Sequence, residues 1–133
     1  MPSSARELVV GGVLLVHGVA HVGPILALVW IAGHGPGSTG PWLAARTWLA
    51  PSLDGRIAAA VACTLWAVAL VGFVAAALGF WGVLPIGGWR AIAAVAAIAS
   101  GAGIIAFLGT WPLFNTAAAM AVNAGVLVAL FVG

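Results

Sequence analysis

Residues 56–80 read RIAAAVACTLWAVALVGFVAAALGF, an apolar run whose one charged residue, Arg56, stands at its start. A helix of about 20 apolar residues is long enough to cross a bilayer core that is about 30 Å thick. The run is continuously apolar and rich in Ala and Leu, whereas a membrane-spanning strand alternates apolar and polar residues. The stretch therefore predicts a transmembrane helix, and it sets the fold class of the whole chain.

Three further segments have the same character, residues 8–32, 89–109 and 112–132. Of the 133 residues, 65% are hydrophobic and 5% are charged, against about 25% charged in soluble domains. We therefore predict an all-α polytopic membrane protein, a four-transmembrane-helix bundle that forms a single membrane domain over residues 1–133. The stretch 8–32 exceeds the apolar core of a signal peptide, about 7 to 15 residues, so we expect a retained span. With four spans, both termini lie on the same side of the membrane.

The connections predict which helices are neighbours. Loop 33–55 contains a Gly/Pro-rich turn followed by PWLAARTWLA, residues 41–50, whose tryptophans and arginine suit a short helix at the membrane interface. The two later connections are short, so the helices that they join are expected to be antiparallel neighbours. Small residues at every fourth position predict close packing seams, one of which could serve a homo-oligomer. These residues are Ala93, Ala97 and Gly101 in the third span and Ala117, Ala121, Gly125 and Ala129 in the fourth.

Few polar side chains lie deep within the spans. The stretch HGVAHVGP, residues 17–24, places two histidines one helical turn apart near the middle of the first span. Counting the helical rise from the side of the termini brings them, with three residues of the later spans, to depths of about 14 to 20 Å. Polar side chains at such depth normally face the bundle interior or a wet cavity. We predict one interior pocket formed by His17, His21, Ser100 and Asn123 and walled by Trp66.

The proline in this stretch adds to the prediction of a polar site. Pro24 has no backbone N–H, so it leaves the carbonyl of Ala20 without its helical donor beside His21, and its ring favours a bend. A bent helix with a free carbonyl and two imidazoles would supply a small polar site within the bilayer. The alternative is that the His and Asn side chains only join helices, through hydrogen bonds worth about 1 kcal/mol each.

The inventory of ionisable groups narrows the chemistry. The chain has no lysine and no tyrosine, which excludes a Schiff base, and its four arginines form no basic cluster, so we expect no nucleic acid. His17 and His21, at i and i+4, have the spacing of two metal ligands. Zinc usually takes four ligands, and neither Glu7 nor Asp54 lies at their depth, so we expect no metal. A bis-histidine haem would require a symmetric dimer, and a single proximal histidine would not.

A quinone or another lipophilic small molecule needs fewer protein groups than a metal or a haem. An imidazole and an amide can bind its oxygen, and an apolar, aromatic wall can contact its ring. We therefore predict that His17, His21, Trp66, Ser100 and Asn123 bind such a molecule, with catalytic residues unknown and enzymatic activity left open. One alternative is a non-catalytic structural or assembly subunit of a membrane complex. Another is a small proton-coupled transporter in which histidine carries the proton. The expected partners are the lipid bilayer, the lipophilic molecule and a second copy or a membrane-complex subunit.

Residues 11–22, GGVLLVHGVAHV, resemble the first helix of the DoxX family of small four-helix membrane proteins. The opening span of that family has an apolar run, then HG, then a basic residue three positions beyond the glycine. His17 and Gly18 match, and His21 stands where the family commonly has lysine, whereas the acidic residue usual in the second span is absent from 56–80. The resemblance covers 12 of the 133 residues. It implies a membrane subunit associated with quinone-linked oxidoreductase or redox-stress complexes, with His17 as the position that carries over.

Overall fold

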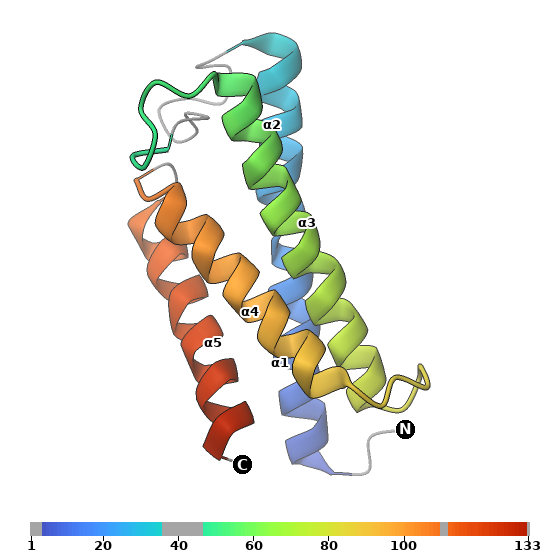
Figure 1. Ribbon diagram of the computed structural model, residues 1–133. Helices are drawn as coiled ribbons and strands as arrows, with labels where there is room; N and C mark the ends of the chain where they lie inside the picture. Colours follow the sequence, from blue (N-terminus) through green and yellow to red (C-terminus); the bar gives the residue numbers. More distant parts are fainter. Residues whose placement is uncertain (1–3, 36–46, 110–111, 133) are drawn as a thin grey trace.

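The computed structural model describes residues 4–35, 47–109 and 112–132, and within them every regular element is a helix. α1 and α2 follow each other as one apolar stretch, Ala5–His34, so four helical segments are long and apolar enough to span a membrane. The predicted all-α class is confirmed, and the ends of the segments lie within three residues of the predicted ones. The helices are α1 (Ala5–Ala20), α2 (Val22–His34), α3 (Gly55–Phe80), α4 (Trp89–Ala106) and α5 (Leu113–Val132) (Figure 1).

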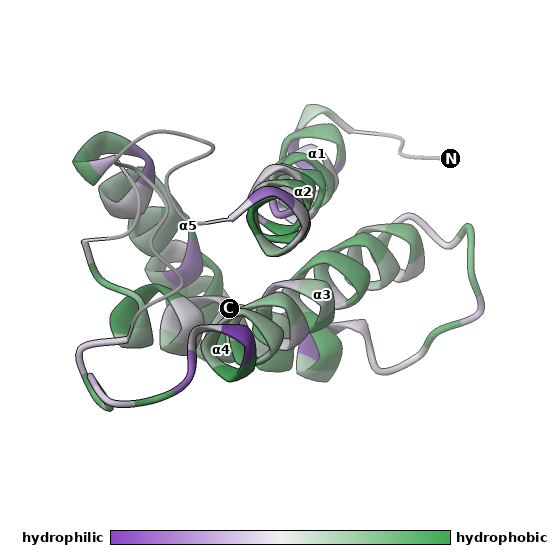
Figure 2. Cartoon of the chain, turned by 90° about the horizontal axis from the view of Figure 1, so that it is seen from above, coloured by the Kyte–Doolittle hydropathy of each residue, from purple (hydrophilic) through white to green (hydrophobic). Residues whose placement is uncertain are grey.

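Apolar residues make up most of every helix (Figure 2), and many of them are exposed. Val16 of α1, Val71 of α3 and Phe131 of α5 are 69%, 66% and 82% exposed. A helix that is apolar on all faces belongs in a hydrocarbon environment or in the core of a large protein. The chain is therefore a multi-pass membrane protein whose outer faces are suited to contact with lipid.

Short polar residues fix the starts of two helices. At α1, the N–H of Glu7 donates to Oγ of Ser4 (3.2 Å) and the N–H of Ser4 donates to Oε2 of Glu7 (3.1 Å). This reciprocal pair is a capping box, which satisfies two backbone donors that the first turn would leave free. At α3, Oδ1 of Asp54 accepts from the N–H of Arg56 (2.9 Å). Both caps lie just outside the apolar runs, at the ends of the predicted spans.

The first span is interrupted at His21, between α1 and α2. The N–H of His21 donates to the carbonyl of Gly18, three residues back (3.0 Å). Pro24 has no N–H to offer the carbonyl of Ala20, so the ladder of i to i−4 hydrogen bonds cannot continue through this turn. The interruption falls within the HGVAHVGP stretch, where the sequence predicted a bend.

The helices of the bundle pack around α3, which contacts α1, α2 and α4, while α5 packs on α4. The short connections therefore join neighbours that run in opposite directions, as predicted (Figure 1). Small residues bring α3 and α4 close together. A Cβ added to Gly72 would lie 2.8 Å from the Cβ of Ala96, so no larger residue fits there without movement. Ala69, Ala76 and Ala93 are fully buried in the same contact.

The predicted seams are only partly used within the chain. Ala93 and Ala97 are buried as predicted, but Gly101 is half-buried and a Cβ there would meet nothing within 4 Å. Ser100 and Gly103 are buried on α4 instead, because the buried residues of α4 recur at spacings of three and four, whereas a stripe of every fourth residue turns gradually away from that face. On α5 the predicted stripe faces outward, because the opposite face, which carries Asn123, is turned toward the bundle. All four residues of the predicted stripe are exposed, namely Ala117, Ala121, Gly125 and Ala129.

The predicted interfacial helix falls partly on residues 36–46, which lie outside the described residues. The described remainder, residues 47–54, forms turns, so the prediction of a helix is wrong for 47–50. The side chains of this segment serve the end of α4 instead: Oγ1 of Thr47 donates to the carbonyl of Ala106 and Nε1 of Trp48 donates to that of Ile105, both at 2.6 Å. These bonds satisfy carbonyls that the last turn of a helix leaves without donors. Pro51 also disfavours a helical conformation at the residue before it.

Candidate functional site

Four polar side chains from three elements meet inside the bundle. His17 lies in the last turn of α1 and His21 at the break after it, and they are 8% and 5% exposed. Ser100 of α4 is fully buried, and Asn123 of α5 is 3% exposed. The structure thus brings together the four polar residues that the sequence placed at one depth.

These side chains form a closed circuit of hydrogen bonds. His17 Nε2 lies 2.8 Å from Oδ1 of Asn123, whose Nδ2 lies 2.9 Å from Oγ of Ser100. Ser100 Oγ lies 2.9 Å from Nε2 of His21, and Nδ1 of His21 lies 2.8 Å from the carbonyl of His17. The circuit joins α1, α4 and α5, and it returns to the residue from which it starts.

With both rings neutral, the donors and acceptors of this circuit can be assigned in only one way. A carbonyl only accepts, so Nδ1 of His21 carries the proton and its Nε2 is the acceptor. Ser100 must then donate its one proton to His21, which makes the Nδ2 of Asn123 the donor to Ser100. The Oδ1 of Asn123 therefore accepts from Nε2–H of His17. The remaining ring nitrogen, Nδ1 of His17, is an acceptor with no hydrogen-bond partner among the described residues.

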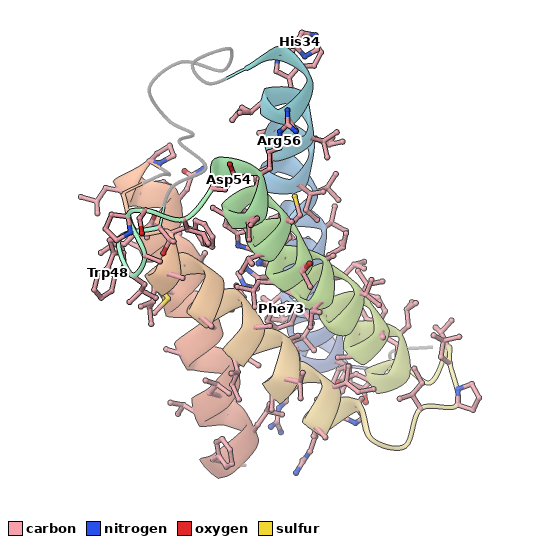
Figure 3. The ribbon with its side chains drawn as sticks, turned by 45° about the horizontal axis from the view of Figure 1, so that its top comes forward. His34, Trp48, Asp54, Arg56 and Phe73 are labelled. Atoms are coloured by element: carbon pink, nitrogen blue, oxygen red, sulfur yellow. The ribbon has the colours of Figure 1, made fainter. Side chains whose placement is uncertain are left out.

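Phe73 of α3 and Gly18 of α1 hold the two imidazoles in place. Phe73 is fully buried and projects from α3 in the middle of the bundle (Figure 3). Its ring lies edge-on to that of His17, with centroids 4.8 Å apart, and stacks on that of His21 at 6.2 Å. A Cβ on Gly18 would lie 2.9 Å from the Cβ of Phe73, so glycine permits this approach of α1 to α3. The HG pair thus combines a polar side chain with the close contact that positions it.

A cavity of about 140 Å³ opens beside the histidines. Its lining is mostly apolar and comes from all four spans. Pro24 belongs to it, so the helix break borders the cavity directly. The lining residues are His17, Ala20, His21, Pro24, Trp66, Ile104, Asn115, Thr116 and Ala119.

The predicted site residues therefore divide into two groups. His17, His21 and Trp66 line the cavity, and Trp66 is 3% exposed, as expected for a wall. Among the described residues that line the cavity, Ser100 and Asn123 are absent. They form hydrogen bonds to the two histidines instead. Ser100 and Asn123 therefore belong to the predicted polar group. Their position does not allow direct contact with a ligand in this cavity.

The site prediction did not include Asn115. Its side chain lines the cavity and has no hydrogen-bond partner among the described residues. The sequence does carry a signal for it, because Asn115 lies eight residues before Asn123 and so shares a helix face with it. The neighbouring Thr116 donates its hydroxyl to the carbonyl of Pro112 (3.1 Å). Asn115 and His17 are thus two cavity-lining residues that each keep a polar group without a hydrogen-bond partner among the described residues.

Among the described residues, no group of three or more His, Cys, Asp or Glu side chains is placed to hold a metal ion. His17 and His21 are the nearest approach, with ring centroids 5.0 Å apart. Three of their four ring nitrogens are engaged in the circuit. The arrangement is suited to binding a small molecule by hydrogen bonds inside an apolar pocket.

The chain was compared with protein-family models, with curated proteins and with solved structures, and none of them matches.

Proposed function

We propose that this membrane protein binds a lipophilic small molecule of the quinone or quinol class in the cavity beside His17 and His21. The observation that carries the proposal is the cavity itself, about 140 Å³ of mostly apolar space that borders two buried imidazoles. A cavity of about 150 Å³ holds one benzene-sized ring. The volume therefore suits a ring head group, and an attached apolar tail would extend through the open side into lipid.

The polar groups of the cavity suit the oxygens of such a ring. Nδ1 of His17 accepts a hydrogen bond, so it would bind the hydroxyl of a quinol. The Nδ2 of Asn115 donates, so it would bind the carbonyl of a quinone. Trp66 and Ile104 supply apolar walls for the ring. The cavity would thus bind both the quinone and the quinol, each through a hydrogen bond to a different residue.

The predicted topology and partners belong to the same proposal. An even number of spans supports termini on one side of the membrane, and α1 begins at the end of the bundle where α5 ends (Figure 1). Ala117 and Ala121, two exposed small residues of α5, are available for a contact with a second copy or another subunit. The redox-associated role implied by the DoxX resemblance fits a quinone ligand.

A second candidate, a structural or assembly subunit without a ligand, is favoured by the closed circuit. A circuit that satisfies Ser100, Asn123 and His21 internally is what interhelical packing alone requires. The predicted proton-coupled transporter stays a prediction.

Filling the cavity without touching the circuit separates these functions. Ala119 lines the cavity, and Ala119→Leu would occupy its volume. Ala121→Leu, on the exposed face of α5, is the matched control. Native mass spectrometry and quinone extraction of both variants, purified gently from membranes, would measure bound quinone, with a ubiquinone analogue added as a probe. We expect the unaltered protein and Ala121→Leu to retain quinone and Ala119→Leu to lose it.

Two outcomes would overturn the proposal. One is an unaltered protein that carries no quinone and takes up none from the added probe. The other is equal retention in both variants, which would show that quinone associates with the protein elsewhere. A packing role would then account for the histidines.

A further inference from the structure

A second cavity, about 520 Å³ in volume, lies at the other end of α1, where α5 ends and α4 begins. It is separate from the histidine cavity, and none of the described residues lines both. Its walls come mainly from α1, α4 and α5, and Phe80 at the end of α3 also lines it. These helices leave room because α1 packs mainly on α3, and α5 mainly on α4. The cavity is large enough to hold part of a lipid.

The lining of this cavity is charged at one end and apolar at the other. Arg6 and Glu7 lie in the first turn of α1, and Arg90 is the second residue of α4. Val13 lines the same cavity seven residues after Arg6, which is about 10 Å deeper along the helix. Val126 and other apolar residues of α5 form the opposite wall. A charged mouth followed by an apolar groove matches the two parts of a membrane lipid.

The charge at the mouth favours an anion. Two guanidinium groups and one carboxylate line it, a formal balance of +2 − 1 = +1. The carboxylate of Glu7 already accepts from the N–H of Ser4 in the capping box (3.1 Å). The guanidinium carbon of Arg90 lies 5.6 Å from the centre of the Trp89 ring, a cation–π contact that helps to position it. Guanidinium groups bind phosphate through paired hydrogen bonds. Because Arg6 belongs to α1 and Arg90 to α4, a phosphate at the mouth could be bound by both helices.

From this arrangement we infer that the cavity binds an anionic membrane lipid. The phosphate of the headgroup lies between Arg6 and Arg90, and part of an acyl chain lies along Val13 and Val126. The inference is independent of the proposed quinone site, because it rests on a separate cavity at the other end of α1.

The first test removes the two positive charges. Native mass spectrometry in detergent would compare binding of phosphatidylglycerol and phosphatidylcholine with the same acyl chains. We expect phosphatidylglycerol to bind the unaltered protein more tightly. The double variant Arg6→Gln with Arg90→Gln should weaken that binding about tenfold, through the loss of charge-assisted hydrogen bonds. Arg56→Gln is the control, since Arg56 is exposed at the opposite end of the bundle (Figure 3).

The second test fills the apolar part and keeps both arginines. Gly125 lines the cavity, and a Cβ there would meet nothing within 4 Å, so Gly125→Leu adds bulk to open space on an exposed helix face. Gly101→Leu is the matched control, because Gly101 also has open space around it and lines neither cavity. We expect Gly125→Leu alone to weaken phosphatidylglycerol binding. This variant decides the question even if the arginine variant does not fold.

Three results would overturn the inference. One is equal binding of the two lipids by the unaltered protein. Another is an equal loss of binding in Arg56→Gln and in the double variant, which would indicate only a general charge effect. The third is full competition by inorganic phosphate at the concentration of the lipid, together with unchanged binding in Gly125→Leu, which would show that no acyl chain is recognised.

Discussion

His17 of α1 donates a hydrogen bond from Nε2 to Oδ1 of Asn123 on α5, across 2.8 Å and between residues 106 positions apart. The backbones of these two helices otherwise approach each other little, because α1 packs mainly on α3 and α5 on α4. The bond therefore joins the first span directly to the last. It also fixes the tautomer of His17, and so decides which ring nitrogen remains for a ligand.

Replacing Asn123 by leucine should lower the free energy of unfolding by about 1 to 3 kcal/mol. The change leaves the N–H of His17 buried without its acceptor and Ser100 without a donor. Unfolding in detergent, followed by circular dichroism, would measure the effect. Asn115→Leu is the matched control, since Asn115 is exposed and has no partner among the described residues. Its effect should stay within about 0.5 kcal/mol, and equal losses in the two variants would contradict the circuit.

Gly18→Ala should destabilise the protein by about 1 to 3 kcal/mol through overpacking. The added Cβ would lie 2.9 Å from the Cβ of Phe73 and 3.2 Å from the backbone N of Val74, so α1 and α3 must separate. Because Phe73 contacts both imidazoles, quinone retention should fall as well. Gly12→Ala has open space around it and should be neutral or stabilising, since alanine is the better helix former. A Gly18→Ala protein as stable as Gly12→Ala would show that the contact is not tight.

Thr47→Val should cost about 1 kcal/mol of stability, because it replaces a buried hydroxyl that caps α4 with a methyl group of similar shape. The Oγ1 of Thr47 donates to the carbonyl of Ala106, and the side chain is 8% exposed. Thr64→Val is the control, since the hydroxyl of Thr64 donates to Ala60 within its own helix and is exposed. Thermal unfolding of the two variants would compare them. A larger loss in Thr64→Val than in Thr47→Val would argue against the cap.

The spans of this protein could be predicted from the sequence because each one is a long apolar run, and the bilayer thickness fixes the length that such a run needs. The polar layer could be predicted for a related reason. Burying His17 or Asn123 in hydrocarbon is costly, so residues of this kind at one depth are expected to face each other. Residue counting gives depth to within a helical turn, which was enough to group four side chains.

The details of the site depend on rotation and on contacts that residue counting does not give. Ser100 and Asn123 lie behind the histidines rather than at the cavity, and Asn115 takes a place in the lining. Successive residues of a helix point about 100° apart around its axis. A small error in the predicted rotation of a helix therefore moves a side chain from the cavity to the contact with a neighbouring helix. For the same reason the four-residue spacing predicts a packing seam at Gly101, where the structure buries Ser100 and Gly103 instead.

The helix break at Pro24 allows a test of whether the protein is less stable because it maintains the cavity. In Pro24→Ala, residue 24 regains an N–H that can donate to the carbonyl of Ala20, so α1 and α2 should join into one helix. We expect the free energy of unfolding to rise by up to about 3 kcal/mol, since a proline in the interior of a helix costs about that much. Pro24 also lines the cavity, so a continuous helix should retain less quinone.

Unfolding in detergent and quinone extraction from the same preparation would measure both effects, and amide hydrogen exchange around residue 24 would report on the new hydrogen bond. Pro85→Ala, in the exposed connection between α3 and α4, is the control and should change neither quantity. A Pro24→Ala protein that is less stable, with unchanged quinone retention, would show that the proline is needed for folding. A protein that is more stable and binds less quinone would show that the break maintains the cavity at the expense of stability.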